Sequence, residues 1–393
     1  MTSAASSKLM TINLGPQHPA THGVLQVVLD LDGETVVNAT PHLGYLHTGI
    51  EKTAEDKLYY KALPLTDRMD YLAPMSNNLG YVLAVEKLLG LEVPEKVQYV
   101  RVLLAEITRL NNHLVWIGTH ALDVGAMSML LYAFREREMI MDIYEAVAGA
   151  RMMSSYFRIG GLAKELPADF DKRVNKLLEV YPDKLNQYED LLTNNRIWIK
   201  RLTGVGAITA EQALDLSLTG PVLRSTGVNY DLRKTHPYSG YEKFDFEVPL
   251  GKNGDCMDRY SIRLIEMRES LKIIRQALDG MPEGPYKADA PGIVLPDKEK
   301  VMTEMEALIF HFKIITEGFK VPAGSYYMGI ESPKGELGYY MVSDGGTKPY
   351  RMRVRPPSLI NLQALSPMVV GGKIADVITC IGSIDIVLGE VDR

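Results

Sequence analysis

A chain of 393 residues, 46% hydrophobic and 23% charged, has the composition of a folded globular protein that can bury a substantial core. Its formal net charge of -6 gives no support to a nucleic-acid-binding function. Cys256 and Cys380 are the only cysteines. They form no CxxC motif, zinc site or iron–sulfur site within the chain, and they favour a reducing compartment without dependence on disulfides.

The N-terminus and the most apolar stretch bear on targeting. Residues 1–8 lack the long apolar core of a signal peptide, and we expect them to form a short mobile tail. Residues 114–134 are long enough to cross a membrane, but polar residues such as Thr119 and Asp123 interrupt them. Because a charge near mid-bilayer is costly, we interpret this stretch as protein interior and the chain as soluble or peripheral to a membrane.

Residues 9–70 are expected to form a β-hairpin region around a histidine-rich loop. The loop, GPQHPATHGV at 15–24, lies between β-like runs at 9–14 and 24–31. An Asp-Gly pair at 32–33 then favours a tight hairpin turn into a third run.

The loop presents two histidines, His18 and His22. Their spacing of four suits a metal on a helix, but Pro19 and the flanking Gly-Pro argue against a helix, and no HExxH glutamate follows. Imidazole can donate, accept or carry a proton near neutral pH, so the loop is a candidate reaction site. The simpler alternative is a loop held together by imidazole hydrogen bonds.

Residues 71–320 are expected to form a helical core. Apolar residues recur at three- and four-residue steps after Pro94, and the same periodicity predicts helices at 127–150, 170–192, 262–278 and 298–312. The intervening segment 204–254 is rich in Gly, Tyr, Asp and Pro, and we expect it to extend over the surface.

Residues 321–393 are expected to form a β-rich segment and an apolar tail. The runs YYMGIES, GELGYYMVS and PYRMRVR alternate at period two between turn residues, which predicts a small antiparallel sheet. A mainly helical bundle with small antiparallel β regions near both ends is an α+β fold.

Two further motifs carry candidate chemistry. RMDY places Arg68, Asp70 and Tyr71 just before a helix, where the phenol can donate a hydrogen bond or a proton; alternatively Asp70 caps the helix and Arg68 pairs with a carboxylate. Asp123 lies in the most apolar stretch and needs a partner, either a histidine or a structural arginine. No P-loop, complete dinucleotide fingerprint or GxSxG motif is present. Residue chemistry alone therefore names no substrate.

Taken together, the motifs resemble the quinone-site subunit family of proton-pumping NADH:quinone oxidoreductase (respiratory complex I), whose bacterial members are called the D subunit. The family is related to the H subunit of the photosynthetic complex and shares its fold with the nickel–iron hydrogenase large subunit. The resemblance covers residues 10–393. The shared stretches are GPQHPATHGV, HLGYLHTGIEK, RMDYLAPM, GTHALDVGA, REREMI, FRIGG, TGPVLRSTGVNYDLRK, SPKGELGYY, RPPSLINLQ and GSIDIVLGEVDR.

The resemblance implies a role for five residues. His22 and Tyr71 would hydrogen-bond the two carbonyl edges of a quinone and act in catalysis with Asp123, which would partner His22. Thr119 would lie in the same quinone-binding cavity. Arg68 would lie beside the terminal iron–sulfur cluster of a neighbouring subunit.

The resemblance also implies cofactors, partners and location. The chain would bind no metal or cofactor by itself, and ubiquinone or menaquinone would be its substrate. Electrons would come from NADH through the partner's 4Fe-4S cluster, coupled to proton translocation. The partners would be the cluster-bearing subunit, the adjacent peripheral C subunit and the quinone-channel membrane subunit, at the cytoplasmic side of the bacterial cell membrane.

Two departures from related patterns limit these expectations. Hydrogenase large subunits carry CxxC pairs near both ends, whereas this chain has RMDYLAPM and ITCIGSIDIV there, which excludes hydrogen activation. Many family members carry a histidine shortly before FRIGG, but Met153 and Ser154 stand in this region. Proton-coupled tuning of the cluster through that residue is therefore not expected.

Two alternatives remain open on the sequence. One is the equivalent subunit of a ferredoxin-dependent photosynthetic-type complex, because the electron entry module lies on other subunits. The other is a non-catalytic scaffold with the hydrogenase fold, although such a scaffold would not require His22, Tyr71 and Asp123.

Overall fold

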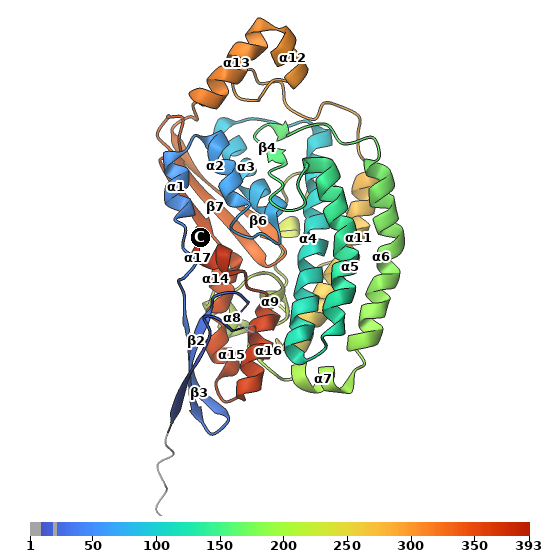
Figure 1. Ribbon diagram of the computed structural model, residues 1–393, viewed down its shortest axis with the longest axis vertical. Helices are drawn as coiled ribbons and strands as arrows, with labels where there is room; N and C mark the ends of the chain where they lie inside the picture. The colour runs from blue at the N-terminus through green and yellow to red at the C-terminus, as the bar shows by residue number, and fades with distance from the viewer. Residues whose placement is uncertain (1–8, 19–21) are drawn as a thin grey trace, which may run out of the picture.

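Two three-stranded sheets lie on one side of a bundle of long helices in the computed structural model, which describes residues 9–18 and 22–393 (Figure 1). The mobile tail expected for residues 1–8 lies outside the described residues. None of the helices in the described ranges is long and apolar enough to cross a membrane.

The bundle consists of α4 (Glu95–Val124), α5 (Ser128–Ala148), α6 (Phe170–Leu192) and α11 (Cys256–Asp279). The central helix α4 packs against both α5 and α11, so that nearly every residue from Val100 to Ala121 is buried. Helix α6 covers one side of the bundle, and its apolar residues recur every three to four positions on one buried face. Its bounds are those predicted from this periodicity. Helix α11 begins six residues before the predicted start, because Asp255 caps it by accepting from Asp258 N.

The N-terminal sheet has the order β1-β2-β3, with β1 (Met10–Leu14), β2 (Gln26–Asp32) and β3 (Thr35–His42), all antiparallel. Alternate residues of β2 are buried, as expected for a sheet with one face toward the protein. Strand β3 packs against α15 (Leu365–Val369) of the C-terminal tail. The histidine-rich loop connects β1 to β2, so this sheet fixes both ends of the loop.

The antiparallel sheet predicted near the C-terminus is present and has the order β6-β7-β8, with β6 (Gly324–Ser332), β7 (Gly335–Ser343) and β8 (Arg351–Arg355). It packs against α3 (Pro74–Leu89). The approach is close at Gly80, where a Cβ would lie 2.8 Å from the ring of Tyr339. Arg351 and Arg353 of β8 form ion pairs with Glu55 and Glu51 of α1 (Ile50–Asp56).

The segment 204–254 does not simply extend over the surface. It forms short helices, and the charged side chains of Arg224, Asp231 and Arg233 within it are buried. Its composition resembles that of a surface loop, but ion pairs with other elements compensate its buried charges. The helices are α8 (Ala210–Asp215), α9 (Gly220–Arg224), α10 (Leu232–Thr235) and the 3-10 helix η2 (Tyr241–Lys243).

The apolar tail is helical and fills the space between the bundle and the N-terminal sheet (Figure 1). Helix α16 (Ile374–Ile384) packs against α4 and α11. The single helix expected at 298–312 is two helices, because the backbone of Glu304 is extended. The remaining elements are α2 (Tyr59–Thr66), α7 (Arg196–Leu202), α12 (Lys298–Thr303), α13 (Met305–Thr316), α14 (Pro357–Leu362), α17 (Leu388–Asp392), β4 (Phe157–Arg158) and β5 (Gly161–Leu162).

Candidate functional site

The clearest polar contact of the histidine-rich loop joins it to the end of α4. His22 Nε2 lies 2.8 Å from Asp123 Oδ2, and both side chains are largely buried. Asp123 belongs to the last turn of α4, which ends at Gly125 in a left-handed conformation. Of the two partners left open by residue chemistry, Asp123 has the histidine, as the resemblance implied. Thr119, one turn earlier on α4, is partly buried and donates its hydroxyl to the carbonyl oxygens of Val115 and Trp116.

A second histidine, His120, lies beside this pair and was not foreseen as a site residue. Its ring packs between Trp116 and Trp198, each with a centroid distance of 5.4 Å. Neither ring nitrogen has a hydrogen-bond partner among the described residues, and burial lowers the pKa of His120 well below its ordinary value. A Cβ on Gly382 of α16 would lie 2.5 Å from His120 Nδ1 and 3.0 Å from Asp123 Oδ2. His120 is therefore a neutral imidazole next to Asp123, and α16 packs tightly against both.

Helix α17 connects the histidine-rich loop with the RMDY turn. A Cβ on Gly23 of the loop would lie 3.3 Å from Leu388 Cδ1 of this helix. On its other side, a Cβ on Gly389 would lie 2.8 Å from the carbonyl oxygen of Met69. The loop and the turn, which are about 45 residues apart in sequence, therefore contact the same short helix.

Tyr71 is the last residue of the RMDY turn and is partly buried. Burial raises the pKa of Tyr71, the charge of Asp70 raises it further, and Lys334 opposes them. Its hydroxyl makes no hydrogen bond within the described ranges, 9–18 and 22–393. The phenol therefore keeps its proton at neutral pH and has a free donor for a ligand.

Asp70 has both a local and a long-range role. Its Oδ1 accepts from Leu72 N at 3.1 Å and from Ala73 N at 3.3 Å, which fixes the turn before α3. These two hydrogen bonds resemble the helix-capping role that the sequence suggested as the alternative for Asp70. Its Oδ2 also forms an ion pair of 2.8 Å with Lys334, which the sequence did not suggest.

Lys334 lies at the centre of a buried polar cluster. It donates to Asn112 Oδ1, and Asn112 Nδ2 in turn donates to Asp385 Oδ2 at 2.8 Å. Burial opposes the charge of Lys334, but the neighbouring carboxylates of Asp70 and Asp385 raise its pKa overall. Burial and the charge of Asp70 raise the pKa of Glu390 to about 8. Glu390 is therefore mostly protonated at neutral pH.

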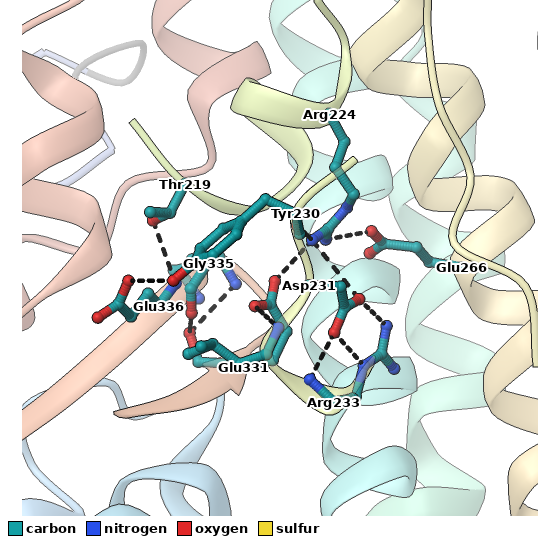
Figure 2. A network of polar contacts seen from close by, with 12 residues as sticks. Thr219, Arg224, Tyr230, Asp231, Arg233, Glu266, Glu331, Gly335 and Glu336 are labelled. Carbon is teal, nitrogen blue, oxygen red and sulfur yellow. Dashed lines mark hydrogen bonds and ion pairs between the residues drawn. The ribbon is translucent and has the colours of Figure 1, made fainter. Parts of the chain in front are cut away.

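A larger ionic network holds the hairpin that carries Lys334 (Figure 2). Figure 2 shows Arg224 between Glu266 of α11 and Glu331 of β6. The guanidinium of Arg224 donates to the carboxylate of Glu266 at 2.5 Å and to that of Glu331 at 2.8 Å. Arg233 pairs with Asp231 at 2.7 Å. Burial and the charge of Asp231 raise the pKa of Glu331 to about 7. The network ties β6 to α9, α10 and α11, so that the hairpin tip has a fixed position.

Arg68 lies on the more exposed side of the RMDY turn. Its side chain is 53% exposed, donates to the carbonyl oxygen of Pro64 at 2.6 Å, and lies 3.7 Å from Asp67. Asp67 is buried, which raises its pKa, and it accepts from Ser155. The segment just before FRIGG therefore contacts the turn, with a serine in the contact rather than a histidine.

Neither a metal-binding cluster nor a cavity suggests a second candidate site. The described residues contain no group of three or more His, Cys, Asp and Glu side chains that could hold a metal ion. A cavity of about 1030 Å³ is lined by residues such as His236, Tyr327 and Glu336, and by none of the five site residues expected from the sequence. The candidate site is therefore defined by the pair of His22 and Asp123 and by the RMDY turn.

Comparison with known proteins identifies the family. The family described as "Respiratory-chain NADH dehydrogenase, 49 Kd subunit" matches residues 123–393. The D subunit of NADH-quinone oxidoreductase from Geotalea uraniireducens is 61% identical over 389 residues, which cover 99% of this chain and all of that protein. The protein of the same name from Citrifermentans bemidjiense is 60% identical over 388 residues, 99% of this chain and all of the relative.

A relative from a third organism gives a similar match. The protein of Solibacter usitatus that is named as D subunit 1 of NADH-quinone oxidoreductase is 61% identical over 391 residues, the whole of this chain and 96% of the relative. The α+β architecture is consistent with the hydrogenase-like fold implied by the resemblance. The chain thus belongs to the 49 kDa family, the D subunits of NADH-quinone oxidoreductase, and is a component of respiratory complex I.

Proposed function

We propose that this subunit reduces quinone in complex I, at a site formed by the histidine-rich loop, the RMDY turn and the end of α4. The observation that carries the proposal is the pair formed by His22 and Asp123. It fixes an imidazole on a loop whose neighbouring helix, α17, also contacts the RMDY turn.

Reduction of a quinone to a quinol takes two electrons and two protons, one on each carbonyl oxygen. His22 and Tyr71 supply the two hydrogen-bond donors, and each can deliver a proton as negative charge develops on the quinone oxygen. Asp123 orients the imidazole and stabilises its charged form. Thr119, one turn before Asp123 on α4, would lie beside the bound quinone. The free hydroxyl of Tyr71 supports this assignment, because a ligand oxygen would supply the acceptor that it lacks.

Electrons reach the quinone from outside this chain. Arg68 lies beside the terminal 4Fe-4S cluster of a neighbouring subunit, and its half-exposed guanidinium is available for such a contact. The other partners are the peripheral C subunit and the membrane subunit that forms the quinone channel. The protein lies at the cytoplasmic side of the bacterial membrane, and quinone reduction is coupled there to proton translocation. Ubiquinone and menaquinone both fit this chemistry.

The test uses membranes that carry Tyr71→Phe, with NADH as donor and two acceptors. One acceptor is a quinone analogue, and the other is ferricyanide, which takes electrons upstream of this subunit. We expect the quinone rate to fall and the ferricyanide rate to persist. Tyr350→Phe is the matched control, because Tyr350 is 67% exposed and removing its hydroxyl should change neither rate.

The other outcomes are equally informative. If both rates persist in Tyr71→Phe, the phenol is structural and the site assignment fails. If NADH supports neither rate in wild-type membranes, the donor is different, and the ferredoxin-dependent complex replaces the NADH-dependent one.

A further inference from the structure

The two cysteines of the chain, 124 residues apart in sequence, meet in the fold. Cys256 is the first residue of α11, and Cys380 lies in α16. A Cβ on Gly206 would lie 2.5 Å from the sulfur of Cys380 and 3.4 Å from that of Cys256. The two side chains also share a hydrogen bond. Gly206 thus lies against both sulfur atoms.

The surroundings of Cys256 favour its thiolate. Arg259 Nη2 donates to the sulfur at 3.2 Å, and the same guanidinium is held by the carbonyl oxygens of Gly254 and Gly206. The position of Cys256 at the N-terminus of a long helix adds to this effect. Burial opposes ionisation, but the hydrogen bond from Cys380 and the charge of Arg259 lower the pKa of Cys256 to about 6.

The surroundings of Cys380 favour its neutral thiol instead. Its hydrogen bond to Cys256 and its burial raise its pKa well above the ordinary value. One sulfur is therefore a nucleophilic thiolate and the other a neutral thiol beside it, the division found in redox-active cysteine pairs.

A thin layer of chain separates the two sulfur atoms from the surface. Gly206 is buried, but Gly204 and Ala207 on either side of it are exposed. Ala207 and Ile208 line a surface pocket of about 340 Å³. A small local opening of this loop would admit a small oxidant to the thiolate.

We propose that Cys256 and Cys380 form an oxidisable dithiol that closes to an intrachain disulfide when hydrogen peroxide reaches it. The thiolate of Cys256 attacks one peroxide oxygen, so that an S–O bond forms, the O–O bond breaks and the leaving hydroxide takes up a proton to become water. The sulfur of Cys380 then loses its proton and attacks Cys256. The S–S bond forms and the S–O bond breaks, which releases the second water and leaves both sulfurs oxidised at the expense of the peroxide.

The disulfide links two helices that meet near the candidate quinone site. Forming an S–S bond of about 2.05 Å draws α16 and α11 together at Cys380. Two residues later, α16 carries Gly382, which packs against Asp123. We therefore infer that oxidation slows quinone reduction; this effect rests on the proposed function, whereas disulfide formation does not.

The test uses the purified complex treated with hydrogen peroxide, followed by alkylation of free thiols and peptide mass spectrometry without reduction. We expect a cross-linked pair of peptides that contains Cys256 and Cys380 and disappears with dithiothreitol. In Cys256→Ser, Cys380 should remain a free thiol. In Cys380→Ser, Cys256 should be trapped as a sulfenic acid by dimedone. Absence of the cross-linked peptides, with both cysteines alkylated after treatment, overturns the proposal.

The NADH-to-quinone rate of the same samples tests the second step. We expect it to fall in the wild-type complex and to recover with dithiothreitol, with the peroxide-treated Cys256→Ser complex as the control for damage to iron–sulfur clusters. If the disulfide forms and the rate is unchanged, the inferred effect on the site is wrong and the oxidisable dithiol stands. A failure of the Tyr71→Phe test would leave the cross-linked peptides unaffected.

Discussion

Lys334 and Asp70 form an ion pair of 2.8 Å in which neither side chain is more than 2% exposed. The pair joins the tip of the β6-β7 hairpin to the RMDY turn, 264 residues away in sequence. Each charge is stable in the interior only because the other, and the hydrogen bonds around them, replace water.

Removal of one partner should therefore destabilise the protein strongly. We expect Lys334→Met to cost about 3–5 kcal/mol, because it leaves Asp70 buried without its cation. The measurement is the amount and thermal stability of the assembled complex. The double variant Lys334→Met with Asp70→Asn should recover part of the loss, and a loss in the double variant equal to the sum of the two single losses would show that the pair is not coupled.

Glu390 should make stability depend on pH. Its pKa is about 8 in the folded chain and 4.5 ordinarily. Between pH 4.5 and about pH 8, the carboxyl of Glu390 keeps its proton in the folded state and loses it in the unfolded state. The free energy of unfolding therefore falls as the pH rises through this window, and it levels off above about pH 8. One such proton contributes a slope of about 1.4 kcal/mol per pH unit. Thermal denaturation of the complex across this range should show a smaller slope in Glu390→Gln, and an unchanged slope would exclude Glu390 as its source.

The sequence predicted those parts of the fold that depend on local periodicity. Helix α6 and the strands β6, β7 and β8 have alternating or helical apolar patterns, and the structure has them at the predicted places. The buried charges of Arg224 and Lys334 were not predicted, because a charged residue in a single sequence indicates a surface position. Their partners, Glu266 and Asp70, lie on other elements and are identified only once the chain is folded.

The candidate site, like the fold, could be predicted from the sequence only in part. Residue chemistry required a partner for Asp123 but left histidine and arginine open, and only the resemblance favoured His22. His120 lies in the motif GTHALDVGA, yet its isolation from hydrogen-bond partners depends on packing by Trp116 and Trp198. Glu390 follows an apolar stretch with few charges, which was the one signal that could have identified it.

The pairing of His22 with Asp123 leads to a prediction for catalysis. Asp123→Asn removes the charge of the acceptor, and a hydrogen bond to a charged group contributes about 1.5–3 kcal/mol. We expect NADH-to-quinone reduction to fall by roughly ten- to a hundredfold while ferricyanide reduction persists. Asp142→Asn on α5 is the matched control, because this carboxylate is 55% exposed and should affect neither acceptor. Normal quinone reduction in Asp123→Asn would mean that the pair has no role in turnover.

The contact of α16 with the site gives a steric prediction. Gly382→Ala would place a Cβ 2.5 Å from His120 Nδ1 and 3.0 Å from Asp123 Oδ2, so that α16 or the end of α4 must shift. Overpacking of this kind costs about 1–3 kcal/mol, and we expect lower quinone reduction in the assembled complex. Adding His120→Ala makes room for the new methyl group and should restore part of the rate. Gly324→Ala is the control, because a Cβ there meets nothing within 4 Å. If Gly382→Ala and Gly324→Ala have equal rates, the packing of α16 against Asp123 does not matter for turnover.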